Sequence, residues 1–406
     1  MRLALLSPLP PDSSALAAYA AQYKRALNQV EIDVLTPLTG QRPITSLAAA
    51  RAWVAERDWR RIDVVHAELT PGSQSEFWVL AALSRLADRP ALSVTLHEPD
   101  KLAWRPLHQP WLALSQWSWL PAPLRSFACW LASPLTLLAE RRLARRIEGF
   151  VVHTKCAAER VIKRLKVPPE RVNVIAPGLS AAGFRPSPPG NLIKVLCVAG
   201  VGQRAKSLEL VLQAWQRARD ASPLVVDRLR MTFVGMTPSG LMQSGLDDPL
   251  LAVRHAAAKR GLEEQIQWVV DPDPRDVTPL MAEHHVMVLP GASVGTHAQV
   301  AHAEALVRHQ DAVQLALANS RPMIVLDQAG LAESVEAGNG VSYQDNDPDA
   351  LAQVLTRLAG EDSPLDQWFA QAQAVLQDRH WSRQALKHLA YFQQVRGRAP
   401  VAAREA

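Results

Sequence analysis

The chain has 406 residues, enough for two or three domains of ordinary size, and it is 48% hydrophobic and 20% charged. Without any low-complexity tract, this composition excludes a disordered or fibrous protein. The net charge of +5 is too small by itself to indicate a nucleic-acid-binding protein, and we expect no nucleic-acid partner. Three scattered cysteines exclude a disulfide scaffold and a CxxC metal site, and they suit a reducing cytosol.

The first half of the chain alternates short apolar runs with helical patterns. The opening MRLALLSP has too short an apolar core for a signal peptide, so we interpret it as a first strand. The alternation predicts a parallel sheet with helices on both faces. The expected strands are Leu3–Leu6, Glu31–Leu35, Asp63–Ala67, Ala91–His97, Gly149–His153 and Val172–Ile175, and the expected helices are Ser13–Gln29, Ser46–Glu56 and Ser75–Ala87.

A basic, tryptophan-rich insert at about residues 101–146 interrupts this pattern. Between Lys101 and Lys166 there are twelve Lys and Arg against three Asp and Glu, and five of the twelve tryptophans. Prolines and Arg125 make a membrane span a poor fit. One interpretation is a surface that contacts anionic lipid; the other is a helical hairpin packed on its own domain, with solvated arginines. The candidate membrane-facing residues are Trp117, Trp119, Arg141, Arg142, Arg145 and Arg146.

The second half repeats the alternation after a segment rich in proline and glycine at residues 177–190. Two Rossmann-like halves joined by a linker predict a deep cleft that both sets of strand ends face. Neither half carries GxGxxG or a P-loop pattern, so classical dinucleotide and P-loop functions have little support. The expected strands are Lys194–Ala199, Arg230–Val234, Ile266–Val270, His285–Leu289 and Met323–Leu326, and the expected helices are Ser207–Arg217, Leu250–Arg260, Val313–Asn319 and Asp349–Leu358.

An ordered set of segments resembles glycosyltransferase family 4, whose members have the GT-B fold. The segments are LALLSPLPPDSSALAAYAAQYKRAL, DVVHAEL, SVTLHEPD, VNVIAPGLSAAGFRP, VLCVAGVGQRAKSLELVLQAW, RPMIVLDQAGLAESVEAGNGVSYQDNDPDALAQVL and WSRQALKHLAYFQQV. The resemblance implies an α/β chain of two Rossmann-like domains. It places an acceptor-binding domain at 1–178, a linker at 179–192, a nucleotide-sugar-binding domain at 193–378 and a helix that returns to the first domain at 379–406.

The resemblance also implies a donor diphosphate site after the first strand of the second domain. Lys206 falls on the lysine with which the family neutralises the departing diphosphate, and the helix that follows would add its N-terminal amides. Val201 occupies the family's arginine position, so Arg204 is at most a displaced substitute. The alternative for Lys206 is a solvated residue in the first turn of the helix, although a cation there opposes the helix dipole. The implied donor-binding residues in this loop are Gly200, Gly202, Arg204 and Lys206.

The family's paired glutamates, spaced Glu-x7-Glu, are missing between Pro290 and Pro322. Glu304 and Asp311 are seven residues apart on an expected helix and share a face. They are candidate replacements that would contact the donor sugar and ribose, or else part of a solvated face. In the glycine-rich turn before them, the implied donor-binding residues are Gly291, Ala292 and Ser293.

On the acceptor side, the first loop carries Ser13 and Ser14 where the family often has paired glycines. Their hydroxyls would contact the acceptor or cap the following helix. His97 ends a strand and matches a family histidine near the sugar, so we take it as a catalytic candidate with Glu304 and Asp311. We interpret His66 and His153, also at strand ends, as core or loop histidines.

These observations favour an enzyme that transfers a sugar from a nucleotide-diphosphate sugar to a lipid-linked or polysaccharide acceptor in cell-envelope biosynthesis. The resemblance implies retention of anomeric configuration, no metal and no cofactor. We expect a cytoplasmic protein that contacts the inner face of the cytoplasmic membrane peripherally. A different hypothesis is an inactive GT-B subunit that stabilises a partner glycosyltransferase, and a third is a non-sugar enzyme such as an epimerase that reuses two Rossmann halves.

Overall fold

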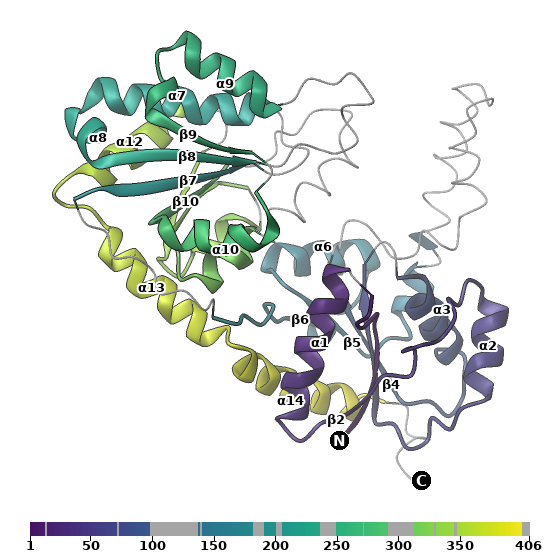
Figure 1. Ribbon diagram of the computed structural model, residues 1–406. Coiled ribbons are helices and arrows are strands. Elements are labelled where there is room, and N and C mark those ends of the chain that lie inside the picture. Colours follow the sequence, from purple (N-terminus) through teal and green to yellow (C-terminus); the bar gives the residue numbers. More distant parts are fainter. Residues whose placement is uncertain are drawn as a thin grey trace, which may run out of the picture. The chain divides into compact units, whose positions relative to one another are not determined.

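The structure is a computed structural model in which the chain divides into two compact units (Figure 1). One unit is Met1–Gly178 with Trp381–Ala406, and the other is Leu179–His380. The structure describes residues 1–12, 14–70, 73–97, 137–138, 140–181, 191–199, 205–235, 249–270, 272–290, 312–328, 330–344 and 347–399.

The first unit is built on a six-stranded sheet in the order β2-β1-β3-β4-β5-β6, with every neighbouring pair parallel. Its strands are β1 (Arg2–Leu6), β2 (Asp33–Leu35), β3 (Val64–Leu69), β4 (Ala91–Leu96), β5 (Gly149–Val152) and β6 (Val172–Val174). Its helices are α1 (Ala15–Asn28), α2 (Leu47–Ala55), α3 (Gln74–Leu83), α6 (Lys155–Leu165) and α14 (Trp381–Gly397), and residues 140–144 are also helical.

Both faces of this sheet are buried because its strands are apolar at successive positions. On β1, Ala4 and Leu6 pack into a core with α2, α3 and α6, whereas Leu3 and Leu5 pack on the other face with α1 and α14. This is the two-residue alternation of a strand covered on both sides. The prediction of a parallel sheet with helices on both faces is confirmed.

The C-terminal helix α14 lies so close to the first sheet that glycine is required opposite it. A Cβ atom on Gly149 would lie 2.5 Å from Tyr391 Oη and from Val395 Cγ2. A Cβ atom on Gly178 would overlap the indole of Trp381, which itself donates to Gln22 on α1 at 2.7 Å. These close approaches hold the last helix against the strands of the first unit.

The second unit repeats the architecture around a sheet in the order β12-β11-β10-β7-β8-β9, again all parallel. The strands are β7 (Ile193–Ala199), β8 (Leu229–Gly235), β9 (Ile266–Val270), β10 (Val286–Leu289), β11 (Met323–Leu326) and β12 (Gly340–Tyr343). The helices are α7 (Ala205–Ala221), α8 (Pro223–Arg228), α9 (Pro249–Lys259), α10 (Pro274–Glu283), α12 (Pro348–Ala359) and α13 (Leu365–Asp378), and residues 312–318 are helical.

The structure differs from the sequence-based elements in a few places. The strand expected from Glu31 begins only at Asp33, because Glu31 has a φ of 62°, which extended backbone does not allow. Helix α10, which has Pro279 inside it, is not among the expected helices. The sequence pattern also gave no separate assignment to α6, α8, α13 or β12.

Within the described parts of the chain, no helix is both long enough and apolar enough to cross a bilayer.

Candidate functional site

Each sheet has a topological switch point, a pair of neighbouring strands from which the chain continues toward opposite edges of the sheet. In the first sheet these are β1 and β3, and in the second they are β7 and β10. Ligands of open α/β sheets bind outside the ends of such strands, at the edge where parallel strands finish, which we call the carboxyl edge. The predicted acceptor loop follows β1, and the two predicted donor segments follow β7 and β10, which end at Ala199 and Leu289.

A groove of about 590 Å³ lies at the carboxyl edge of the first sheet, between the segments that follow β1, β2 and β3. The polar residues that line it include Ser7, Asp12, Ser14, Ser73 and Glu76. Burial, with a smaller contribution from the charge of Asp12, raises the pKa of Glu76 to about 6. This groove is large enough for a sugar-sized ligand.

Ser14, a predicted acceptor contact, begins α1. Its hydroxyl accepts a hydrogen bond from the Ala17 amide at 3.2 Å, and its own amide donates to Asp12 Oδ1 at 2.8 Å. A serine at this position satisfies an amide that the first helical turn leaves free. Ser14 therefore caps the helix and also lines the groove; Ser13 lies outside the described residues.

A buried layer of polar side chains runs across β3 and β4 beneath His97. His66 and Glu68 are two residues apart on β3, so they share a face, and Ser93 and Thr95 do the same on β4; all four are fully buried. His66 Nδ1 lies 2.8 Å from Ser93 Oγ, and its Nε2 lies 3.0 Å from Glu68 Oε1 and 2.9 Å from Thr95 Oγ1. The layer places a carboxylate inside the sheet, directed toward the carboxyl edge.

His97 follows β4 and joins this layer to a second histidine. Its Nε2 lies 2.6 Å from Glu68 Oε2, and its Nδ1 lies 3.2 Å from Nε2 of His153, which follows β5. The Tyr19 ring meets the imidazole of His97 edge-on, with ring centroids 5.2 Å apart. The side chain of His97 is 18% exposed, whereas Glu68 is fully buried behind it.

The hydrogen-bond partners decide where the protons lie. His153 Nδ1 is 3.0 Å from the Ile175 carbonyl oxygen, which can only accept, so His153 donates from Nδ1. Burial, and then the charge of His97, lower the pKa of His153 to about 3, so the ring is neutral and its Nε2 accepts from His97 Nδ1–H. One proton then lies in the short contact between His97 Nε2 and Glu68.

The charge of Glu68 is stabilised from both sides. Burial by itself would raise the pKa of Glu68, but the hydrogen bonds from His66 and His97, together with the charges of these rings, outweigh burial and hold the pKa well below its usual range. The arrangement orients an imidazole at the carboxyl edge with a buried carboxylate behind it, as in sites where a carboxylate fixes a histidine. A ligand oxygen that accepts from His97 Nδ1 would take the place of His153.

Sequence reasoning singled out His97 and missed Glu68, and it interpreted His66 and His153 as core or loop histidines. His66 is a core residue, but it also donates to or accepts from three polar side chains, and His153 contacts His97 directly. The segment DVVHAEL contained a signal, because a carboxylate two residues after a histidine lies on the same face of a strand.

Most of the predicted donor side lies outside the described residues. Lys206 is the second residue of α7, directly after the segment that leaves β7. Unlike Lys206, the remaining predicted donor and membrane residues listed next lie outside the described part of the chain: Gly200, Gly202, Arg204, Gly291, Ala292, Ser293, Glu304, Asp311, Trp117 and Trp119.

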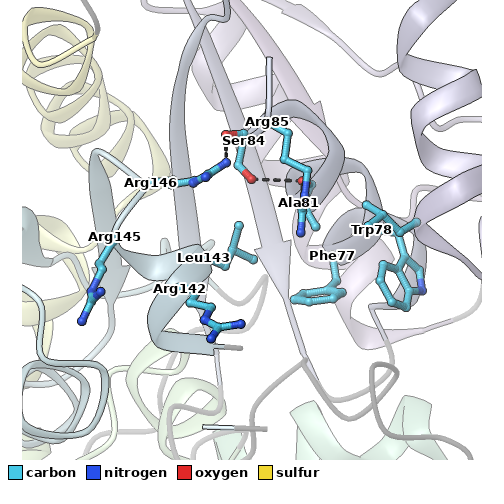
Figure 2. Close-up of a pocket in the computed structure, with 10 residues that line it drawn as sticks. Phe77, Trp78, Ala81, Ser84, Arg85, Arg142, Leu143, Arg145 and Arg146 are labelled. Carbon is cyan, nitrogen blue, oxygen red and sulfur yellow. Dashed lines mark hydrogen bonds between the residues drawn. The ribbon is translucent and has the colours of Figure 1, made fainter. Parts of the chain in front are cut away.

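The predicted arginine cluster splits in the structure. Arg142, Arg145 and Arg146 line one pocket (Figure 2). Arg141 instead donates from Nε to the Arg164 carbonyl oxygen at 3.0 Å. The described residues hold no group of three or more His, Cys, Asp and Glu side chains placed to bind a metal ion.

Comparisons with known proteins agree with this architecture. The family model for the glycosyl transferase 4-like domain matches residues 10–178, and the model for glycosyl transferases group 1 matches residues 193–361. D-inositol 3-phosphate glycosyltransferase 1 of Catenulispora acidiphila is 27% identical over 249 residues. That alignment covers 58% of this chain, and the chain spans about half (54%) of the length of that curated relative.

Solved structures of the same fold cover nearly the whole chain. A glycosyltransferase from Rickettsia africae ESF-5 covers 98% of this chain and 99% of its own, with a TM-score of 0.56 and 12% identity. Sucrose-phosphate synthase from Thermosynechococcus elongatus covers 98% and 100%, with a TM-score of 0.60 and 14% identity. An alpha,alpha-trehalose-phosphate synthase (UDP-forming) from Burkholderia xenovorans, in complex with glucose-6-phosphate, covers 97% and 100%, with a TM-score of 0.56 and 12% identity.

At these identities the solved structures show the fold alone, a pair of Rossmann-like units of the GT-B type. The two family models match one unit each and together cover most of the chain. With a glycosyl transferase 4-like domain followed by a glycosyl transferases group 1 domain, the chain is a GT-B glycosyltransferase of the glycosyl transferase 4-like type.

Proposed function

We propose that this protein transfers a sugar from a nucleotide-diphosphate sugar to a lipid-linked or polysaccharide acceptor in the synthesis of the cell envelope. The observation that carries the proposal is the Glu68–His97–His153 chain at the carboxyl edge of the first sheet, where ligands of this fold bind. The UDP-forming synthase of the same fold supports a nucleotide-diphosphate sugar as donor.

In the proposed reaction the second unit holds the donor. Lys206, Arg204 and the N-terminal amides of α7 would neutralise the departing diphosphate. Glu304 or Asp311 and the turn of Gly291, Ala292 and Ser293 would hold the sugar and ribose. Transfer with retention and without a metal ion then depends on orientation and on donors directed at the developing charge, rather than on a strong protein nucleophile.

In the first unit, Ser14 and the groove after β1 would receive the acceptor, and His97 would orient the reacting sugar. Glu68 fixes the His97 ring through Nε2, which leaves Nδ1 as the nitrogen that can donate to a ligand oxygen in place of His153. The conformation of His97 is therefore set before substrate binds, which is the condition for catalysis by positioning. The basic segment around Arg142 would bring this unit to the anionic inner face of the cytoplasmic membrane.

The experiment that tests this proposal incubates the purified protein with a panel of nucleotide-diphosphate sugars and a membrane-lipid extract, and measures the release of nucleotide diphosphate. We expect turnover with one donor, and we expect His97→Ala to lower it at least about tenfold, or about 1.4 kcal/mol of barrier. The matched control is His255→Ala, on the exposed face of α9, which should leave turnover unchanged. Turnover that survives His97→Ala would remove His97 from the reaction.

A second candidate function is an inactive GT-B subunit that stabilises a partner glycosyltransferase. The absence of a Glu-x7-Glu pair between Pro290 and Pro322 favours it. This function predicts no turnover with any donor, no thermal shift with nucleotides, and a co-purifying enzyme whose activity falls when this chain is removed. The same donor panel therefore separates the two functions.

A further inference from the structure

A pocket of about 450 Å³ lies between α3 and the helical segment 140–144, away from the polar layer of His97. Figure 2 shows Phe77 and Trp78 on the α3 side, and Leu143 with Arg142 opposite them. Arg85 follows α3 in the connection to β4, and Arg146 lies in the connection to β5. Because β4 and β5 are parallel neighbours, these two arginines lie at the edge where the strands begin, opposite the edge that carries His97.

The positive charge of this pocket has no counterpart among the described residues. Arg85, Arg142, Arg145 and Arg146 line it, and none of them forms an ion pair with a described acidic side chain. Burial, followed by the charges of Arg51 and Arg146, lowers the pKa of Arg85. An anion bound between these arginines would offset the repulsion between their positive charges.

The acidic residues nearest to Arg142, Arg145 and Arg146 along the chain do not supply that anion, and Asp88, nearest to Arg85, pairs with Arg60 at 3.7 Å. Burial raises the pKa of Glu140 to about 8, and its contact is with Arg164, 3.8 Å away. Glu148 is held by both terminal nitrogens of Arg89, at 2.8 and 2.9 Å. In the sequence between His97 and Leu137, the only acidic residues are Glu98 and Asp100.

All four arginines are exposed, and two of them, Arg85 and Arg146, are anchored by hydrogen bonds and still have hydrogen atoms to donate. Arg146 Nη1 donates to the Ser84 carbonyl oxygen at 3.0 Å, and Arg85 donates to the Ala81 carbonyl oxygen (Figure 2). A guanidinium carries five N–H groups, so each of these arginines retains donors for a ligand. Planar, anchored guanidinium groups bind phosphate oxygens in pairs, with less loss of side-chain entropy than lysine.

One wall of the pocket is apolar. Phe77, Trp78 and Leu143 lie beside the arginines, and these residues are 1%, 8% and 7% exposed. A free inorganic anion would gain nothing from such a wall, whereas a ligand with a phosphate and an attached hydrocarbon part would contact both halves of the pocket.

We propose that this pocket binds the phosphate of an anionic membrane lipid, with Arg85, Arg142 and Arg146 on the phosphate and Phe77, Trp78 and Leu143 against the glycerol and first acyl carbons. The inference rests on the proposed membrane contact but not on sugar transfer. The proposed lipid site is a defined pocket rather than a diffuse attraction between charges. It includes Arg85, which no sequence pattern indicated, and it does not include Arg141. A lipid held at this edge would leave the carboxyl edge open to substrates.

The test is flotation of the full chain with vesicles of phosphatidylcholine containing 30% phosphatidylglycerol, at 150 mM salt. We expect the triple variant Arg85→Gln, Arg142→Gln, Arg146→Gln to lower the bound fraction at least tenfold. The matched control is the triple variant Arg60→Gln, Arg61→Gln, Arg254→Gln, which removes the same charge from exposed sites outside the pocket and should change binding less than twofold. Equal losses in both variants would overturn the proposal in favour of nonspecific attraction.

Two further measurements separate the lipid site from its alternatives. By calorimetry, we expect dihexanoyl phosphatidylglycerol to bind at least tenfold more tightly than inorganic phosphate; equal affinities would reduce the pocket to a plain anion site. If circular dichroism shows that the triple variant is unfolded, flotation is measured with the single variant Arg142→Gln instead, and an unchanged bound fraction would overturn the proposal. His97→Ala should float like the unaltered chain, so failure of sugar transfer and failure of lipid binding can be told apart.

Discussion

Replacing Glu68 by glutamine tests the polar layer under His97 most directly. Glu68 is fully buried and accepts from His66 at 3.0 Å, from Thr95 at 3.2 Å and from His97 at 2.6 Å. Hydrogen bonds to a charged group contribute about 1.5–3 kcal/mol each. Glutamine keeps the shape and one acceptor oxygen but turns an NH₂ group toward one of these partners, so at least one of the three bonds is lost.

We therefore expect Glu68→Gln to lower the free energy of unfolding of the first unit by about 2–4 kcal/mol. Glu68→Ala should lower it by about 3–5 kcal/mol, the range for removing one partner of a buried charged pair. Urea unfolding followed by circular dichroism gives both values. The control is Glu56→Gln, whose side chain is 73% exposed and which should change stability by less than about 0.5 kcal/mol.

The hydrogen bonds of His97 and His153 should also be visible by spectroscopy. Nitrogen shifts of labelled histidine should show a neutral His153 protonated at Nδ1, and Glu68→Gln should change the His97 signals and leave the His153 tautomer in place. A Glu68→Gln protein with unchanged stability and unchanged His97 signals would refute the placement of a proton between Glu68 and His97.

Three other predictions follow from single features. Burial lowers the pKa values of His153 and His388 to about 3 and 4, so below about pH 6.5 the unfolded chain binds protons that the folded chain does not. As the pH is lowered from 6.5, the free energy of unfolding should therefore fall by up to about 1.4 kcal/mol per pH unit for each histidine. A free energy of unfolding that stays constant from pH 7 to 5 would contradict this. Gly340→Ala should unfold the second unit at lower urea, because its Cβ would overlap a carbonyl oxygen of β11 at a φ of 155°, whereas Gly397→Ala has open space and serves as the control. Lys206→Ala should weaken nucleotide-diphosphate binding by about 1.5–3 kcal/mol in calorimetry, and unaltered affinity would remove Lys206 from the donor site.

The sequence by itself determined the fold class. Runs such as LALL in β1 and VMVL in β10 are apolar at successive positions and therefore on both faces, and only a parallel sheet covered on both sides buries them. It also placed His97, the loop after β1 and the segments before Lys206 and after Pro290 at strand ends, because strand and helix periods are local properties that the order of residues records.

Only the tertiary structure decided which of these residues work together. Glu68 acquires its role from His97, 29 residues later and directly after the neighbouring strand, and from His66 beneath it. A pattern in one strand cannot reveal a partner on another, because strand order and register come from packing of the whole sheet.

The arginines show the same limit. Arg141, Arg142, Arg145 and Arg146 form a single basic run in the sequence, yet Arg141 donates to the Arg164 carbonyl oxygen, whereas the other three line the pocket beside α3. Arg85, distant in the sequence, reaches the same pocket because α3 and the segment before β5 cover one face of one sheet. Residue type and spacing fix what each element is, whereas a site is assembled from elements that only the folded sheet brings together.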